Sequence, residues 1–290
     1  MEILFELYKG RVKGKFLGPT EDKPNRHLYY VDGKPKTGVT SFLAIKDKSR
    51  ALVPWSQEET AKYLFAHLEA GGKINEEVIV KAAFASDERK AKAADIGTLV
   101  HDWVERYIRH KLKEVGFKTM PDMPEDPNVL TGVTSFLEWE AEHKVKYLWA
   151  EKVLYSLKYD YIGKGDFGAV VDGMKCLCDL KSSNGLYNEV RMQTAAYAMA
   201  DTEESKFKYD GRWAIRVAKE TEPEYLARME LKNKVKNLLG KNGAEVRPYQ
   251  VFEAKFLDNE KGFMKRDFEA FLNCMNLLRW DRETDFYKER

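Results

Sequence analysis

The sequence predicts an α/β fold, and three observations lead to that prediction. From about residue 90 onward, a helical pattern, three short β-rich runs, a second helical pattern and another β-rich run follow one another. Hydrophobic residues make up 43% of the 290 positions, enough to bury a sizeable core. No internal repeat interrupts this order. We therefore expect an amino-terminal elaboration over residues 1–90 and a core over residues 91–290, with a central mixed sheet flanked by helices.

The amino-terminal part is expected to form a β-hairpin followed by helices. Residues 3–33 carry β-rich runs, and the Asp-Gly pair at 32–33 is typical of a turn. A short helix is predicted to begin at Val39. After Pro54, apolar residues recur at helical spacing until two glycines at 71–72 end the pattern, and further helices are expected to about residue 112.

Helices and strands follow one another in the rest of the chain. Three prolines between residues 114 and 128 forbid a continuous helix, so a loop is expected there. Asn128 is expected to cap the next helix, which runs to about Val145. An Asp-Gly turn at 172–173 joins two β-rich runs into a hairpin. The later elements are predicted as strands at 151–159, 166–174, 175–183, 212–219 and 249–256, a helix at 186–200 and a terminal helix.

The overall charge of the chain does not indicate a nucleic-acid partner. The 49 basic and 47 acidic residues leave a net charge of +2, so local patches would have to hold such a partner. Three cysteines are too few for a disulfide framework. No uninterrupted apolar run reaches the roughly 18 residues of a membrane span. We therefore expect a soluble, intracellular protein without a membrane partner.

One candidate patch for nucleic acid lies between residues 29 and 55. Basic and aromatic residues mix there, and such a mixture can track phosphates and stack a base. An ordinary charged surface explains the pattern equally well. The residues are Lys34, Lys36, Lys46, Lys48 and Arg50, flanked by Tyr29, Tyr30 and Trp55.

The residues that carry chemistry gather in the predicted strands. Asp179 and Lys181 are separated by one residue, so both side chains leave the strand on the same face. Asp166 lies in the preceding strand, which the tight turn makes an antiparallel neighbour. Glu151 opens the first strand of the sheet, and His101 lies on a helix that can cover the site. Carboxylate oxygens with one imidazole suit Mg²⁺ or Mn²⁺ better than a structural zinc.

Hydrolysis of a phosphodiester explains why these residue types would be gathered. The reaction needs a water made nucleophilic and stabilisation of the developing negative charge, and metal ions bound by carboxylates provide both at neutral pH. Lys181, beside the metal, would orient or deprotonate the water or stabilise the pentavalent phosphate.

These motifs resemble the RecB-like branch of the PD-(D/E)XK nuclease superfamily. The chain carries G-x-x-D at 163–166, D-x-K at 179–181 and Q-x-x-x-Y at 193–197, preceded by Gly-Thr at 97–98 and by His101 on a helix. The resemblance covers about residues 90 to 220. In addition, VTSFL at 39–43 followed by VPW at 53–55 looks like the amino-terminal part of viral and mitochondrial exonucleases of this branch.

The resemblance implies a role for each matched position. His101, Asp166, Asp179 and the backbone carbonyl of Leu180 would bind one or two Mg²⁺ or Mn²⁺ ions. Glu151 would complete or polarise the site, and Lys181 would be the catalytic lysine. Residues 1–90 would help to form a DNA channel. Gln193 and Tyr197 would contact DNA or brace the site. The other residues expected to contact DNA are Thr40, Ser41, Lys46, Lys48 and Arg50.

The resemblance further implies a metal-dependent deoxyribonuclease of recombination, repair or replication, with an exonuclease favoured. An endonucleolytic or structure-specific enzyme and a DNA-binding protein on a decayed nuclease fold stay open as alternatives. Family members with an iron-sulfur cluster need four spaced cysteines, so we expect none here. Strand polarity, strand preference, oligomeric state and a recombinase or single-strand-annealing partner are not decided by the sequence.

Two other interpretations fail on the sequence. The run at 162–170 matches the kinase phosphate loop G-x-G-x-x-G-x-V, but the H-R-D-x-x-x-x-N loop is absent and too little chain follows for a second lobe, so no nucleotide is expected. His101 and Glu105, with His110 beyond, suggest zinc, but H-E-x-x-H is absent, and a solvated helix face explains these residues better.

Overall fold

Five strands form the central sheet of this computed structural model, which describes residues 2–18, 20, 22–23, 26–238, 240, 248–259 and 262–283. The strand order is β5-β6-β7-β8-β9, with β7 and β8 parallel and the other neighbouring pairs antiparallel. The mixed sheet confirms the predicted α/β class. The strands are Val145–Ser156 (β5), Tyr161–Val171 (β6), Met174–Lys181 (β7), Gly211–Val217 (β8) and Phe252–Asp258 (β9).

The hairpin between β6 and β7 forms where the sequence places its Asp-Gly pair. Asp172 has a φ of 51° and Gly173 a φ of 85°, and a two-residue type I′ turn requires such left-handed conformations. The next pair, β7 and β8, is parallel and so needs a long crossover, which contains α5 (Asn188–Ser205). The turn and the crossover together fix which ends of β6, β7 and β8 meet.

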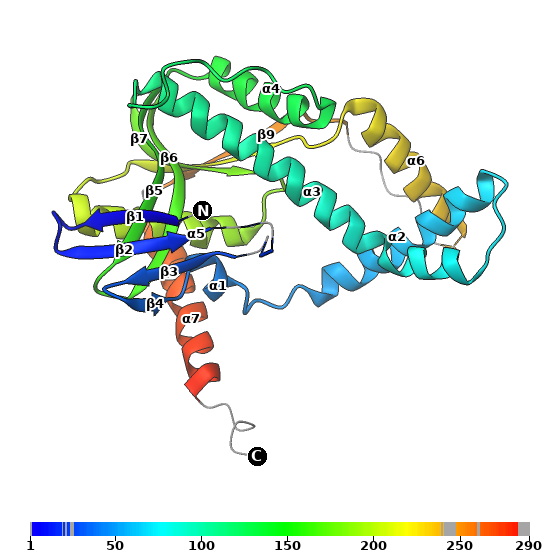
Figure 1. The fold of residues 1–290 in the computed structure, drawn as a ribbon, viewed down its shortest axis with the longest axis horizontal. Coiled ribbons are helices and arrows are strands. Elements are labelled where there is room, and N and C mark those ends of the chain that lie inside the picture. The colour runs from blue at the N-terminus through cyan, green and yellow to red at the C-terminus, as the bar shows by residue number, and fades with distance from the viewer. Residues whose placement is uncertain are drawn as a thin grey trace.

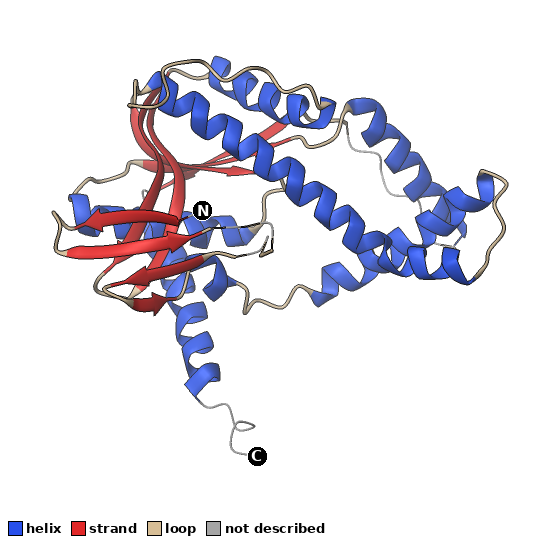
Figure 2. Cartoon of the chain, in the orientation of Figure 1, coloured by secondary structure: helices blue, strands red, loops and turns tan. Residues whose placement is uncertain are grey.

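Helices cover both faces of the sheet (Figure 2). On one face, α3 (Glu76–Lys111) and α4 (Pro127–Glu142) bury a core that includes Phe136, Trp139 and Phe167. On the other, α1 (Val39–Leu43), α5 and α7 (Phe263–Glu283) pack around Tyr161 and Phe271. Each of these large apolar side chains contributes about 1.5–3 kcal/mol when fully buried, so the two cores hold the sheet in place.

The amino-terminal strands form a second, antiparallel sheet of order β1-β2-β3-β4. It packs through Phe16 and Val31 against Tyr155 and Ile162 of the central sheet, and Figure 1 shows it in front of β5 and β6. The expected hairpin is therefore part of a larger sheet. Its strands are Glu2–Leu7 (β1), Val12–Leu17 (β2), Leu28–Val31 (β3) and Lys34–Lys36 (β4).

A helical arm extends away from the sheet and consists of α2 (Ser49–Glu69), the first half of α3 and α6 (Glu222–Leu238) (Figure 1). An ion pair joins α6 to α2, because Lys232 lies 3.7 Å from Glu58, whose carboxylate is also 2.7 Å from the buried Lys62 of the same helix. Because α3 runs unbroken past residue 90, the expected boundary between residues 90 and 91 falls inside a helix and not in a linker.

Several local predictions need correction. Asp126, not Asn128, caps α4, because its carboxylate accepts hydrogen bonds from the N–H groups of residues 128 and 129 while Pro127 occupies the first helical position. The predicted helix to Val145 ends at Glu142, and β5 begins at Val145. Pro54 lies inside α2, near its start, so that helix begins before the proline.

Among the described helices, none combines the length and the apolar character that a membrane crossing requires.

Candidate metal centre

The hairpin of β6 and β7 places Asp166 and Asp179 at facing positions. The register pairs Phe167 with Cys178, so the next residues along the two strands lie opposite each other. The carboxylate of Asp166 also accepts a 2.6 Å hydrogen bond from the backbone N–H of Leu180. The two acidic residues are thus neighbours at the end of the hairpin, where β6 and β7 stop pairing.

Asp166 belongs to a cluster that can hold a metal ion. One ligand atom each from His101, Glu151 and Asp166 lies within 4.8 Å of the others. Nδ1 of His101 is 3.9 Å from Oδ1 of Asp166. The helix α3 brings the imidazole to the carboxylates of β5 and β6, although about 50 residues or more separate it from them in the sequence.

An unusual backbone conformation positions Glu151. Its φ of 49° lies in the left-handed region, which side chains rarely adopt. The two neighbours of Glu151 leave opposite faces of the sheet: Ala150 packs into the core beneath α3 and α4, whereas Lys152 forms an ion pair with Asp201 of α5. Regular strand geometry would put them on one face. The conformation at Glu151 shifts this alternation, and the carboxylate lies beside Asp166.

Asp179 and Lys181 form a buried pair beside this cluster. Nζ of Lys181 is 2.6 Å from Oδ2 of Asp179, whose side chain is only 1% exposed. The other oxygen, Oδ1, has no hydrogen-bond partner among the residues that the structure describes. An unpaired buried carboxylate oxygen is costly, and a bound cation removes that cost. The donor set therefore fits a divalent cation.

Burial and mutual repulsion disturb the acidic groups. Burial, followed by the charge of Asp166, raises the pKa of Glu151 to about 8. Burial also raises the pKa of Asp179 to about 6, although the nearby Lys181 opposes the shift. For Asp166, burial raises the pKa against the lowering effects of Lys181 and the Leu180 N–H. Several carboxylates with raised pKa values in one place are typical of a functional site.

His101 is held neutral. Burial, with the positive charge of Lys181 as the second cause, lowers the pKa of His101 to about 4. A neutral imidazole has a lone pair free for a metal ion, which a protonated one lacks.

Lys164 is a member of this site that the sequence analysis missed. Its ammonium forms an ion pair with Glu151 and lies 5.7 Å from the centre of the Phe16 ring. A hollow of about 330 Å³ is lined by Lys164, Glu151, Asp166 and His101, among others. The signal was present, because Lys164 stands two residues before Asp166 in a strand.

The Gln193 and Tyr197 pair supports the strands from behind. Nε2 of Gln193 donates a 3.2 Å hydrogen bond to the hydroxyl of Tyr197. The Tyr197 ring is 4% exposed and packs on Gly163, where a Cβ would come within 2.4 Å of it. The burial of Tyr197 favours the bracing role over a contact with DNA. The same packing buries the kinase-like glycine run inside β6, where it forms no phosphate loop.

The predicted amino-terminal patch is divided in the structure. Lys46 and Lys48 lie 3.4 and 3.8 Å from Glu189 at the start of α5, whereas Lys36 pairs with Asp160 at 2.7 Å. Tyr29 is buried under the amino-terminal sheet. The side chains of Thr40, Ser41 and Arg50 are exposed. Of the five basic residues, only Lys48 lines the larger cavity described next.

A second and larger cavity, about 950 Å³, adjoins the hollow of about 330 Å³ along α3. His101 and Ser182 line both hollows, so the two share a wall. Basic side chains outnumber acidic ones in the larger cavity. The basic residues are Lys48, Arg89, Lys90, Lys92, Lys181, Lys219 and Arg228, and the acidic ones are Glu220 and Glu224.

A scan against protein-family models finds no family that matches the chain, and a search of the curated proteins finds no relative.

Proposed function

We propose that this protein is a metal-dependent deoxyribonuclease of the RecB-like PD-(D/E)XK type. The carrying observation is the cluster of His101, Glu151 and Asp166 within 4.8 Å, with Lys181 paired to Asp179 beside it. Carboxylates with one imidazole favour Mg²⁺ or Mn²⁺, bound as one or two ions. The preference for an exonuclease, and a role in recombination, repair or replication, rest on the sequence resemblance alone.

Each residue has a defined task in this proposal. Asp166, Glu151 and His101 hold the cation, and Asp179 joins them through Oδ1, the oxygen that is not paired with Lys181. When bound, the cation lowers the pKa of a coordinated water and stabilises negative charge on the phosphate. Lys181 keeps a raised pKa, because Asp179 and Asp166 outweigh its burial. It therefore stays charged at neutral pH and orients the water or stabilises the pentavalent phosphate.

Digestion of end-labelled linear and closed circular DNA tests the proposal. Wild-type protein should cut with Mg²⁺ and not with EDTA, and loss of linear DNA alone would identify an exonuclease. Lys181→Ala should reduce the rate by roughly 100-fold or more, because it removes a charge aimed at the transition state. Lys175→Ala is the matched control, since Lys175 is an exposed lysine of the same strand.

Full activity of Lys181→Ala would contradict the proposed site. DNA binding without any Mg²⁺-dependent digestion by the wild-type protein would instead support the alternative of a DNA-binding protein on a decayed nuclease fold.

A further inference from the structure

The larger cavity lies where two parallel strands end. In the register of the parallel strands, Lys181 of β7 lies beside Arg216 of β8, so the two strands end at the same edge of the sheet. The residues that follow, Ser182 to Asn184 after β7 and Lys219 and Glu220 after β8, line the cavity together. The carboxyl ends of parallel strands are a common place for ligands. Because Lys181 and His101 also line this cavity, a ligand there would reach the candidate metal centre.

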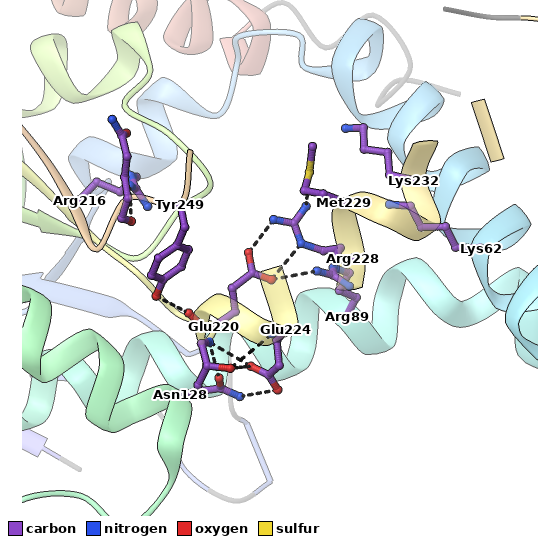
Figure 3. Close-up of polar contacts among 12 residues, drawn as sticks. Lys62, Arg89, Asn128, Arg216, Glu220, Glu224, Arg228, Met229, Lys232 and Tyr249 are labelled. Atoms are coloured by element: carbon purple, nitrogen blue, oxygen red, sulfur yellow. Dashed lines mark hydrogen bonds and ion pairs between the residues drawn. The ribbon is translucent and has the colours of Figure 1, made fainter. Parts of the chain in front are cut away.

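The cationic groups around Lys219 exceed the acidic ones that can neutralise them. Figure 3 shows Arg228 and Arg89 turned toward Glu220. The Arg228 guanidinium donates hydrogen bonds of 2.9 and 2.6 Å to that carboxylate, and Arg89 lies 3.8 Å from it and 3.7 Å from the carboxylate of Glu59. Both oxygens of Glu220 are therefore engaged by arginines.

The ammonium of Lys219 has no such partner. Within the described ranges, no oxygen accepts a hydrogen bond from it and no carboxylate lies within ion-pair distance. Burial, and then the charges of Arg89, Arg228 and Arg216, lower the pKa of Lys219, with Glu220 the only opposing group. A half-buried cation among other cations lacks a counter-ion. An anion in the cavity supplies one.

We propose that Lys219 and Arg89 form a phosphate-binding subsite in this cavity, which holds a phosphate of the DNA strand next to the one that is cut. The subsite rests on the proposed nuclease function. Its ligand is a phosphate oxygen, because clustered Lys and Arg donors match phosphate geometry and charge. Either an internal phosphodiester or a terminal phosphate presents that chemistry. Trp55 and Tyr187 line the same cavity and offer aromatic faces to the bases.

Binding of labelled single-stranded oligodeoxynucleotides in EDTA, where no strand is cut, tests the subsite. Lys219→Gln should weaken binding roughly tenfold and lower the slope of log affinity against log salt by about 1, because one phosphate contact is lost. Lys219→Arg should restore most of both. Lys265→Gln, which removes a distant exposed lysine of α7, is the control and should change neither.

Two further arms separate the possible ligands. If the subsite takes a terminal phosphate, wild-type protein prefers a 5′- or 3′-phosphorylated strand over a hydroxyl-ended one, and Lys219→Gln loses that preference. If it takes an internal phosphodiester, the variant binds all strands more weakly by the same factor. An affinity and salt slope equal to those of Lys265→Gln would overturn the subsite. Lys219→Gln should be at least as stable as wild type, because it removes an unpaired charge.

Failure of the nuclease proposal is distinguishable. If wild-type protein binds no DNA, the melting temperature in the presence of inorganic phosphate tests whether the subsite exists. Phosphate should then raise the melting temperature of wild type more than chloride of equal ionic strength does, and Lys219→Gln should lose that difference. No difference in wild type would overturn the subsite as well.

Discussion

The two hollows that adjoin each other along α3 gather side chains of opposite charge. At the smaller hollow, Glu151, Asp166 and Asp179 are crowded, and their pKa values are raised. At the larger one, Lys219 is crowded by arginines, and its pKa is lowered. The charge of the one hollow suits a cation and that of the other suits an anion. A phosphodiester whose cut bond meets a metal ion while its neighbouring phosphate meets Lys219 would satisfy both at once.

The two hollows also share part of their lining, which we call the shared wall. His101 and Ser182 face both hollows, so a change in the wall should disturb both. A change in one lining should disturb only that side. Predictions for Asp166, Glu151 and Gly97 test this difference, and the expected effects become smaller in that order.

The largest effect is expected from Asp166→Asn. It removes a proposed metal ligand, and we expect Mn²⁺ affinity measured by titration calorimetry to fall about 100-fold. Asp102→Asn is the control, because Asp102 lines the same hollow but lies outside the ligand cluster. DNA binding in EDTA should change little, since the basic side is untouched. Equal Mn²⁺ affinity in the two variants would remove Asp166 from the metal site.

A pH dependence of stability is expected from Glu151. Its pKa is about 8 in the folded protein, against an ordinary value of 4.5. Between these values the folded protein holds a proton that the unfolded chain has released, so the free energy of unfolding in EDTA falls as the pH rises from 5 to about 8. The expected loss is on the order of 2 kcal/mol. Urea denaturation at several pH values measures it.

Two comparisons sharpen the Glu151 prediction. Glu151→Gln should flatten the pH profile in EDTA, because the amide does not titrate. Saturating Mg²⁺ should reverse the trend in wild type, because the cation favours the ionised carboxylate. Equal slopes of the wild-type and Glu151→Gln profiles in EDTA between pH 5 and 8 would contradict the raised pKa of Glu151, because His101 and Asp179, whose pKa values are also shifted, are present in both proteins.

The smallest effect is expected from Gly97→Ala, because Gly97 packs against Ser182, which lines both hollows. A Cβ there would lie 2.4 Å from Oγ of Ser182, so the Ser182 side chain must rotate or the loop after β7 must shift. Overpacking costs typically 1–3 kcal/mol, and the better helix propensity of Ala offsets about 1 kcal/mol of it. We expect a net loss of about 1 kcal/mol and weaker binding of both Mn²⁺ and DNA.

A second substitution checks the cause. Adding Ser182→Gly to Gly97→Ala removes the clashing atoms and should recover the stability, with Ser182→Gly alone as reference. No recovery would show that the strain lies elsewhere.

Much of the central sheet could be predicted from short-range sequence patterns. Alternation placed Asp179 and Lys181 on one strand face, and an Asp-Gly pair fixed the hairpin that sets Asp166 opposite Asp179. The order of helices and strands gave the α/β class. The errors concern boundaries, such as the cap at Asp126 and the start of α2, where neighbouring residues compete for the same role and only packing decides between them.

The sequence by itself therefore determined which residues share a strand and which way a tight turn folds, because both depend on a few adjacent dihedral angles. Only the tertiary structure decided that α3 brings His101 to the carboxylates, that Glu151 leaves the regular alternation, and that Lys219 meets Arg89 and Arg228. His101 lies 50 positions or more from the carboxylates, and Arg89 lies 130 positions before Lys219. The geometry of these contacts depends on how whole helices pack on the sheet, which no local pattern encodes.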